Sequence, residues 1–171
     1  VGFYFISMRL AEFTLFFATV SFYIWSGEIS NLYQRKKFRE VQILLRNSSR
    51  LCFSTSLIFF FFSIYFAEEI LLLVNEDYIA NVLLFQIALL GFLILGCAGI
   101  LGPMFYIVGD IKYLTKLQFL IGLVFLFMIF VSVPFYGILG SAISFVICQV
   151  FYIAFMAFRL KSKFKFSISP F

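Results

Sequence analysis

The stretch IKYLTKLQFLIGLVFLFMIFVSVPFYGILGSAISFVICQVFYIAFMAFRLKSK, residues 111–163, decides the fold of this chain. It contains two long apolar segments, about 113–133 and 137–158, and the short connection 134–136 between them carries no charge. Its basic residues lie near the two ends of the stretch, at Lys112, Lys116, Arg159, Lys161 and Lys163. About 20 apolar residues in a helix cross the roughly 30 Å of hydrocarbon in a bilayer. The stretch therefore predicts a hairpin of two membrane-spanning helices.

Three more apolar segments precede this hairpin, at about 1–26, 51–66 and 80–108. The chain of 171 residues is 64% hydrophobic and only 12% charged, whereas a soluble domain keeps about a quarter of its residues charged. Because a helix satisfies its own backbone hydrogen bonds in lipid, all five segments are expected to be helical. The sequence therefore predicts an all-α integral membrane protein with about five transmembrane helices, forming one bundle over residues 1–171, and excludes a soluble domain.

The basic residues are concentrated in every second connection. Thirteen Lys and Arg residues are present, and all except Arg9 lie in the first connection, around the third connection or in the tail. The charged residues of the second connection are all acidic, namely Glu68, Glu69, Glu76 and Asp77. Lys and Arg are retained in cytoplasmic loops more readily than they are translocated. We therefore expect the chain to start outside and to end in the cytoplasm. The net charge of +5 follows from this topology and does not indicate a nucleic-acid partner.

The first connection contains a predicted amphipathic helix at about 33–50. Its apolar side chains recur at helical spacing, at Phe38, Val41, Leu44, Leu45 and Leu51. The charged side chains fall on the other faces, so this helix is expected to lie on the cytoplasmic interface and to run into the second span. Its bases have two possible interpretations: they hold the topology and contact anionic lipid headgroups, or they have a specific regulatory or partner role.

Small residues and prolines predict bends and close helix contacts. The span 80–108 is expected to bend near Gly102–Pro103. The outer segment 68–77, in which Ile70–Val74 lie between acidic pairs, predicts a short helix in the outer interface. The fifth span has a face of small residues that lets helices approach closely. This face is formed by Gly137, Gly140, Ser141, Ala142 and Ser144.

Residues suited to catalysis or metal binding are scarce. The chain has no His, and its three cysteines, Cys52, Cys97 and Cys148, lie far apart in apolar segments. Cysteines in that setting are interpreted as small buried hydrophobic residues. The sequence has no phosphate-binding loop, no serine-hydrolase motif and no metal-ligand cluster. We therefore predict no cofactor, no metal and no enzymatic activity.

Arg9 and Glu12 are the only charged residues well inside a predicted span. A charge at that depth is costly unless it is paired or faces water, so it marks a functional candidate. Their spacing of three places them on one helix face, where they can pair, and we assign Ser7 and Thr19 to the same face. With the chain start near the outer surface, Arg9 lies about 12 Å deeper at 1.5 Å per residue, near mid-membrane, where transporters usually hold substrate. Because the first span is polar on one stripe and apolar elsewhere, it is expected to line a cavity. The alternative is a pair that only neutralises itself at a helix–helix contact.

Five pieces of the chain carry a resemblance to a known family. They are VGFYFISMRL (1–10), ISNLYQRKKFREVQILLRNSSRL (29–51), VNEDYIANVLLFQIALLG (74–91), GPMFYIVGDIKYLTKLQFL (102–120) and VPFYGILGSAISFVICQV (133–150). In this order they resemble the C-terminal half of the polysaccharide and oligosaccharide flippases, the Wzx-type (O-antigen) branch of the multidrug/oligosaccharidyl-lipid/polysaccharide exporter superfamily. The last piece, in which an outer Tyr-Gly precedes a Gly-Ser-Ala face, is the most specific of the five.

The resemblance implies two six-helix halves that face each other across a central cavity. This chain then supplies roughly spans eight to twelve and lacks the N-terminal half, which becomes its partner. The implied task is to flip lipid-linked (undecaprenyl pyrophosphate) oligosaccharide units across the bacterial cytoplasmic membrane, by alternating access. Arg9, in the Met-Arg-Leu that matches the family's aromatic-Arg-Leu run, is implied to meet the pyrophosphate or acidic sugars. The chain departs from the family in its first span, which lacks the family's proline, and at Asn75, where many relatives have glycine.

Three alternatives stay open at the level of sequence. A cation-coupled multidrug exporter of the same superfamily would require several intramembrane acids, and this chain shows only Glu12. A membrane enzyme such as an oligosaccharide polymerase would need a sizeable outer loop with catalytic groups, and the outer loops here are short and lack Arg and His. A non-transport membrane assembly subunit would have no need of a charged pair inside its first span.

Overall fold

The computed structural model describes residues 2–98 and 101–164, and nearly all of them are helical. In chain order the elements, with η for 3-10 helices, are α1 (Gly2–Glu12), η1 (Phe13–Leu15), α2 (Phe16–Gln34), α3 (Phe38–Tyr65), α4 (Ala67–Leu72), η2 (Glu76–Asn81), α5 (Val82–Cys97), α6 (Leu101–Val108), α7 (Ile111–Tyr136) and α8 (Ile138–Phe164). Four segments are long and apolar enough to cross a membrane: Phe38–Tyr65, Glu76–Val108, Ile111–Tyr136 and Ile138–Lys163. No strand occurs within the described ranges. The predicted all-α membrane fold is confirmed.

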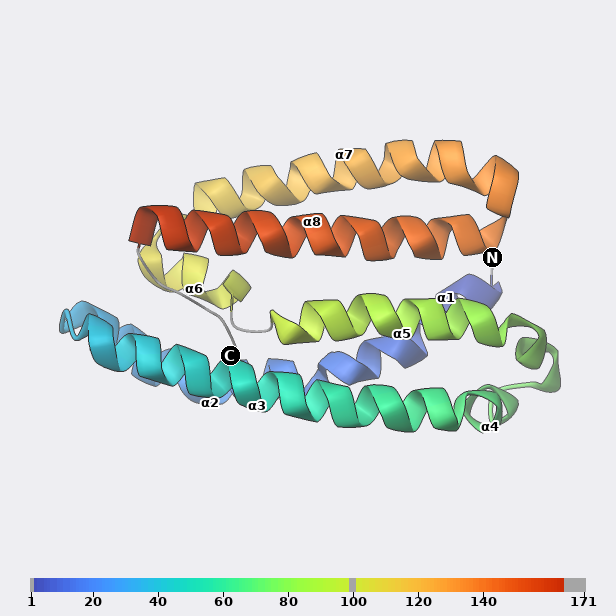
Figure 1. The fold of residues 1–171 in the computed structure, drawn as a ribbon, viewed down its shortest axis with the longest axis horizontal. Coiled ribbons are helices and arrows are strands. Elements are labelled where there is room, and N and C mark those ends of the chain that lie inside the picture. Colours follow the sequence, from blue (N-terminus) through green and yellow to red (C-terminus); the bar gives the residue numbers. More distant parts are fainter. Residues whose placement is uncertain (1, 99–100, 165–171) are drawn as a thin grey trace.

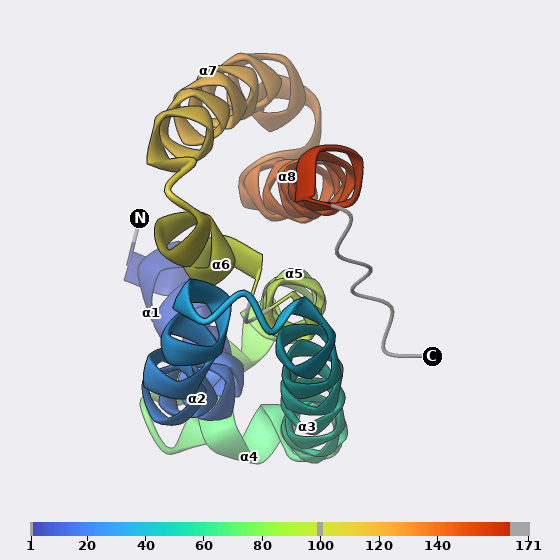
Figure 2. The ribbon, with the colours of Figure 1, turned by 90° about the vertical axis from the view of Figure 1, so that its left-hand side faces the viewer.

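The long helices run side by side along the molecule. α7 and α8 form an antiparallel hairpin on one side (Figure 1). α5 packs between α8 and α3. In the view along the helices, α1, α2 and α6 lie to one side of the row formed by α8, α5 and α3 (Figure 2). α4 and η2 close the end opposite the turn between α2 and α3. This arrangement makes α5 the central helix of the bundle.

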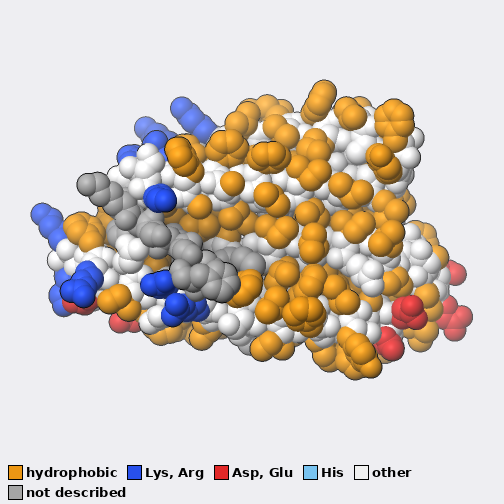
Figure 3. Space-filling view, in the orientation of Figure 1, with side chains coloured by type: hydrophobic (Ala, Val, Ile, Leu, Met, Phe, Trp, Pro, Cys, Tyr) orange, Lys and Arg blue, Asp and Glu red, His pale blue; other side chains and the backbone are white. Residues whose placement is uncertain are grey.

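The charges gather at the two ends of the bundle. Lys and Arg side chains cluster at the end that holds the α2–α3 turn, whereas acidic side chains mark the end formed by α4 and η2 (Figure 3). Large apolar side chains such as Phe61, Phe127 and Phe130 are exposed between the ends, as expected of a surface in lipid. The Phe3 ring lies 4.8 Å from the Tyr78 ring of η2, so the chain begins at the acidic end. α8 ends at the basic end. The orientation in the membrane stays a prediction.

The α7–α8 hairpin is tighter than the sequence suggested. The predicted connection 134–136 is part of α7, which includes Pro134 and ends at Tyr136. The turn is therefore reduced to Gly137, whose φ of 57° lies in the left-handed region that favours glycine. Gly140 then passes so close to α7 that a Cβ atom would lie 2.7 Å from the Ser132 carbonyl oxygen. These glycines allow two long helices to pack with almost no loop between them.

The first apolar segment differs from the predicted single span 1–26. It is helical from Gly2 to Gln34, but the 3-10 segment η1 separates α1 from α2. The Thr14 hydroxyl donates to the Ala11 carbonyl at 2.7 Å, and Ser56 of α3 donates to the Thr14 carbonyl at 3.4 Å. These side chains replace part of the regular helical hydrogen bonding at the break. Neither α1 nor α2 is among the four segments that are long and apolar enough to cross a membrane.

The predicted amphipathic helix 33–50 also has different bounds. Residues up to Gln34 belong to α2, and the chain turns at Lys36, which has a φ of 58°. α3 begins at Phe38 and continues without interruption to Tyr65. The amphipathic segment and the predicted second span are therefore one helix.

The predicted third span is interrupted as well. α5 ends at Cys97 and α6 begins at Leu101, so the break comes slightly before the expected bend at Gly102–Pro103, and residues 99–100 lie outside the described ranges. Pro103 is the third residue of α6. The outer segment 68–77 contains most of α4 and the start of η2.

Candidate functional site

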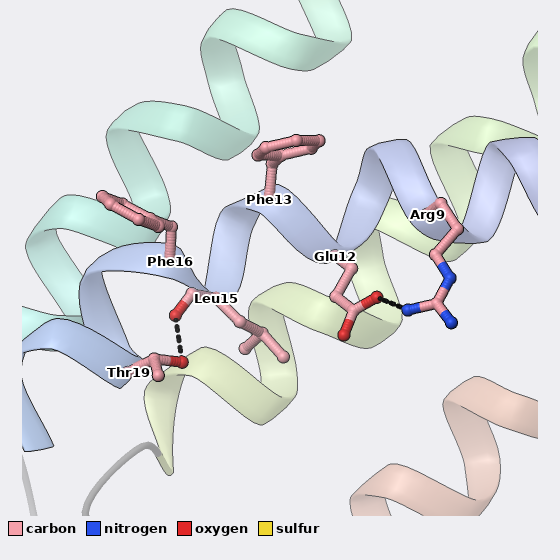
Figure 4. A pocket seen from close by; sticks show the side chains of 6 residues that line it. All are labelled: Arg9, Glu12, Phe13, Leu15, Phe16 and Thr19. Atoms are coloured by element: carbon pink, nitrogen blue, oxygen red, sulfur yellow. Dashed lines mark hydrogen bonds and ion pairs between the residues drawn. The ribbon is translucent and has the colours of Figure 1, made fainter.

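Arg9 and Glu12 form an ion pair on the surface of α1. The Arg9 Nη1 atom donates to Glu12 Oε2 at 2.8 Å (Figure 4). The guanidinium also lies 5.3 Å from the centre of the Phe5 ring. The two charged side chains remain 64% and 48% exposed. Their spacing of three makes this a contact within one helix, so the pair ties α1 to no other element. The predicted pairing is confirmed.

The pair borders an open pocket of about 410 Å³ on the outside of the bundle. α1, η1 and the start of α2 form its wall, with Arg9, Glu12, Phe13, Leu15, Phe16 and Thr19 as lining residues (Figure 4). The Thr19 hydroxyl donates to the Leu15 carbonyl at 3.0 Å and so is satisfied within its helix. The side chains that offer charge in this pocket are therefore Arg9 and Glu12.

The opposite side of α1 packs into the bundle. Ala11 is fully buried in an apolar cluster with Phe85, Ala88 and Leu89 of α5. Arg9, two residues from Ala11, therefore lies at the same level along the bundle as the apolar part of α5, but on the opposite face of α1. A guanidinium carries five N–H donors in a fork that fits a phosphate, and only part of this capacity is used by Glu12. The pocket can thus accept an anionic group at Arg9 or a cation at Glu12.

Ser7 does not belong to this site, and its assignment to the face of Arg9 and Glu12 is wrong. Its side chain is fully buried, and its Oγ atom has no hydrogen-bond partner among the described residues. Residues two apart in an α-helix differ by about 200° around the axis, which places Ser7 and Arg9 on nearly opposite faces. Thr19, by contrast, lines the same pocket as Arg9 and Glu12, as predicted.

Asp110 is a charged residue that sequence reasoning missed. It lies between α6 and α7, and its carboxylate pairs with Arg159 Nε and Lys163 Nζ of α8, each at 3.1 Å. The Arg159 guanidinium also lies 4.6 Å from the centre of the Tyr113 ring. Burial alone would raise the pKa of Asp110, but the hydrogen bonds and charges of Arg159 and Lys163 outweigh it and hold the pKa below its usual value. This cluster joins two helices and is best described as structural.

The cysteines offer no clear site. Cys52 and Cys148 are buried and are not joined in a disulfide, and the side chain of Cys97 lies outside what the structure describes. The Cys148 sulfur lies 4.0 Å from the sulfur of Met128. Among the described residues, no group of three or more His, Cys, Asp or Glu side chains is placed to hold a metal ion. The Arg9–Glu12 pocket is therefore the candidate functional site.

Comparison with known proteins adds no relative to this picture. No protein-family model matches the chain, and no curated protein matches it. The resemblance to the flippases therefore stays a prediction, carried by the five sequence pieces and by the site.

Proposed function

We propose that this chain is part of a membrane transporter that flips undecaprenyl-pyrophosphate-linked oligosaccharide by alternating access. The observation that carries the proposal is the Arg9–Glu12 pair, which is level with the apolar part of α5 and faces out of the bundle into an open pocket. A charged pair at membrane depth is costly against lipid and is retained where it meets water, a substrate or another bundle. The outward face of α1 is then one wall of a transport cavity.

Arg9 is the residue proposed to meet the diphosphate. A guanidinium binds phosphate oxygens through two parallel N–H donors, and these bonds are stronger when both partners are charged. Glu12 orients the guanidinium, because it accepts a hydrogen bond from one of its nitrogens at 2.8 Å. The exposed rings of Phe13 and Phe16 offer apolar surface for the lipid part of such a substrate.

The proposed setting is the bacterial cytoplasmic membrane, with the basic end of the bundle in the cytoplasm. The separation of Lys and Arg from the acidic end supports this orientation, because basic residues are retained on the cytoplasmic side. The start of α1 then lies at the outer surface and the end of α8 in the cytoplasm. A second bundle, facing the Arg9 pocket, would complete the cavity.

The test is Arg9→Ala in the complete transporter, with Lys116→Ala as the matched control. We expect Arg9→Ala to abolish export of the lipid-linked oligosaccharide while its level in the membrane stays normal. Lys116→Ala removes one exposed positive charge at the basic end, outside the pocket, and is expected to export normally. Normal export by the Arg9 variant would rule out this role.

A cation-coupled multidrug exporter is the second candidate, because Glu12 places an acid in the same pocket. Neutralising that acid, Glu12→Gln, would then abolish cation-dependent efflux of a drug while Arg9→Ala leaves efflux intact. The reverse pattern, with Arg9 essential, favours the flippase.

A further inference from the structure

A second pocket lies at the acidic end of the bundle, where α3 ends and the chain continues into α4 and η2. Its volume is about 570 Å³. Most of its lining side chains are apolar, and they come from all three elements, for example Phe62 of α3, Leu72 of α4 and Ile79 of η2. The two polar side chains that line it are the carboxylates of Glu68 and Glu69. The pocket is therefore an apolar groove with negative charge at one place.

The two carboxylates of the groove have no positive partner within the bundle. Glu68 and Glu69 are both exposed, and neither is in an ion pair among the described residues. The sequence explains this, because positions 51–111 contain no Lys or Arg. A molecule that is complementary to the groove therefore has a positively charged group next to an apolar part.

The apolar wall of the groove continues along α3, which is one of the helices suited to crossing a membrane. Leu51, Ile58 and Phe62 are all exposed. Their spacings of seven and four residues place them within about 40° of one another around the helix axis, so they form an apolar stripe. The stripe covers about 16 Å at 1.5 Å per residue, close to half of the roughly 30 Å of hydrocarbon in a bilayer. It is therefore long enough to accompany one acyl chain through one leaflet.

A phospholipid with a primary amine in its headgroup is the occupant that these features favour. A primary ammonium has three N–H donors, and its hydrogen bonds to carboxylates are strengthened by the opposite charges. A choline headgroup has the same charge but no N–H donor, and an anionic headgroup would be repelled by both carboxylates. The ring centres of Phe62 and Phe66 lie 4.9 Å apart. These rings contact each other, so they form an apolar wall and not a cage around a cation.

We propose that this groove binds phosphatidylethanolamine from the surrounding bilayer. The ammonium of the headgroup donates to the carboxylates of Glu68 and Glu69, and one acyl chain lies along the apolar stripe of α3. The groove shares no lining residue with the Arg9 pocket. The lipid site is thus independent of what the protein transports.

The experiment measures which phospholipids the purified protein retains. The protein is reconstituted in nanodiscs with equal parts of phosphatidylethanolamine, phosphatidylcholine and phosphatidylglycerol, and native mass spectrometry counts the bound molecules of each. We expect the wild type to retain phosphatidylethanolamine in preference to the other two. The double variant Glu68→Gln, Glu69→Gln removes both carboxylates. It should reduce this preference by about fivefold, which is the upper range for an exposed pair of opposite charges.

The matched control is the double variant Glu76→Gln, Asp77→Asn. These two acids lie at the same end of the bundle, in the first turn of η2, but they do not line the groove. The control removes the same amount of negative charge as the groove variant. It is expected to retain phosphatidylethanolamine with the preference of the wild type.

Equal losses in the two double variants would overturn the proposal, because they would show that only the net charge of this end matters. Equal retention of phosphatidylcholine by the wild type would also overturn it, since the choline group has no N–H donor. A dimer that forms in the wild type and is lost in the groove variant would identify a second copy of the chain as the occupant instead. If the groove variant fails to fold, Glu69→Gln alone tests the site. Its expected loss is about twofold, and the preference of the wild type in this variant would contradict the proposal.

Discussion

The α7–α8 hairpin and the first apolar segment, from α1 through η1 to α2, both carry ion pairs, but these have different consequences in the two regions. In the hairpin, Asp110 at the start of α7 pairs with Arg159 and Lys163 near the end of α8. In the first segment, Arg9 and Glu12 pair within one helix and face out of the bundle. The ion pairs of Asp110 hold α7 and α8 together, whereas the Arg9–Glu12 pair leaves its region open toward a ligand or a partner.

The packing of the two regions differs in the same way. At the end opposite Asp110, the hairpin is closed by the Gly137 turn and by the contact of Gly140 with the α7 backbone. The Ser132 and Ser144 hydroxyls, 3.0 Å apart, add a hydrogen bond between the two helices. The first segment is instead divided by η1, beside the candidate pocket. A 3-10 stretch within a helix often marks a functional hinge or a sequence under strain, so the contrast supports the proposal that the first segment lines the site and that the hairpin is scaffold.

The largest stability effect is expected at the closed end of the hairpin. Gly140→Ala places a Cβ atom 2.7 Å from the Ser132 carbonyl oxygen, and backbone atoms cannot move aside cheaply. Overpacking of this kind typically costs about 1–3 kcal/mol. We expect a clear fall in melting temperature of the purified protein, followed by circular dichroism in detergent.

Gly122→Ala is the matched control in the same hairpin. A Cβ atom at Gly122 in the middle of α7 meets no atom within 4 Å. Alanine is favoured over glycine inside a helix by about 0.5–1 kcal/mol, so this variant should be as stable as the wild type or more stable. Equal melting temperatures for the Gly140 and Gly122 variants would break the view that the hairpin is closed by a backbone contact.

Most of the hairpin was predictable from the sequence, but its turn was not. Lipid requires long apolar helices, so hydropathy alone locates α7 and α8. The segment containing Pro134 resembles a connection because proline normally interrupts a helix. The structure keeps it within α7, near the C-terminal end, because Gly137 alone reverses the chain at a positive φ. A dihedral angle of one glycine cannot be read from apolar periodicity.

The second-largest loss of stability is expected from a mutation at the other end of the hairpin, and it depends on pH. The pKa of Asp110 is lowered in the folded protein, so its ion pairs stabilise the fold above the ordinary Asp pKa of about 3.9. This stabilisation is lost as the pH falls through the lowered value. Because Arg159 and Lys163 are partly exposed, we expect a contribution of only about 1 kcal/mol. Asp110→Asn should lower the melting temperature at neutral pH and show a smaller further fall on acidification than the wild type.

Asp77→Asn serves as the control for Asp110→Asn. It neutralises an exposed carboxylate in η2, at the opposite end of the bundle from Arg159 and Lys163. Its acid profile should follow that of the wild type. If both variants reduce the pH dependence of the melting temperature equally, the Asp110 ion pairs do not stabilise the hairpin. The hairpin and the first segment then no longer differ in how their ion pairs contribute to stability.

The candidate site shows where sequence reasoning succeeds and fails. The Arg9–Glu12 pair was predictable because a spacing of three on a helix sets the contact. Ser7 was misplaced because its polarity was taken as membership of a polar face, although two residues turn a helix by about 200°. Asp110 was missed because Arg159 lies 49 residues away in sequence. A single acid between Gly109 and the base Lys112 was the one available signal.

The smallest stability effect is expected from the Arg9–Glu12 pair, and its smallness is informative. Exposed pairs at this spacing contribute about 0.3–0.5 kcal/mol, and both side chains here are well exposed. A double-mutant cycle of Arg9→Ala and Glu12→Ala, followed by melting temperature, should therefore give a coupling below about 1 kcal/mol. A coupling larger than that of Asp110 with Arg159 would mean that the pair clamps the fold. If the coupling is small and Arg9→Ala alone also keeps the melting temperature of the wild type, a loss of transport in that variant cannot arise from unfolding, and the defect then belongs to the pocket.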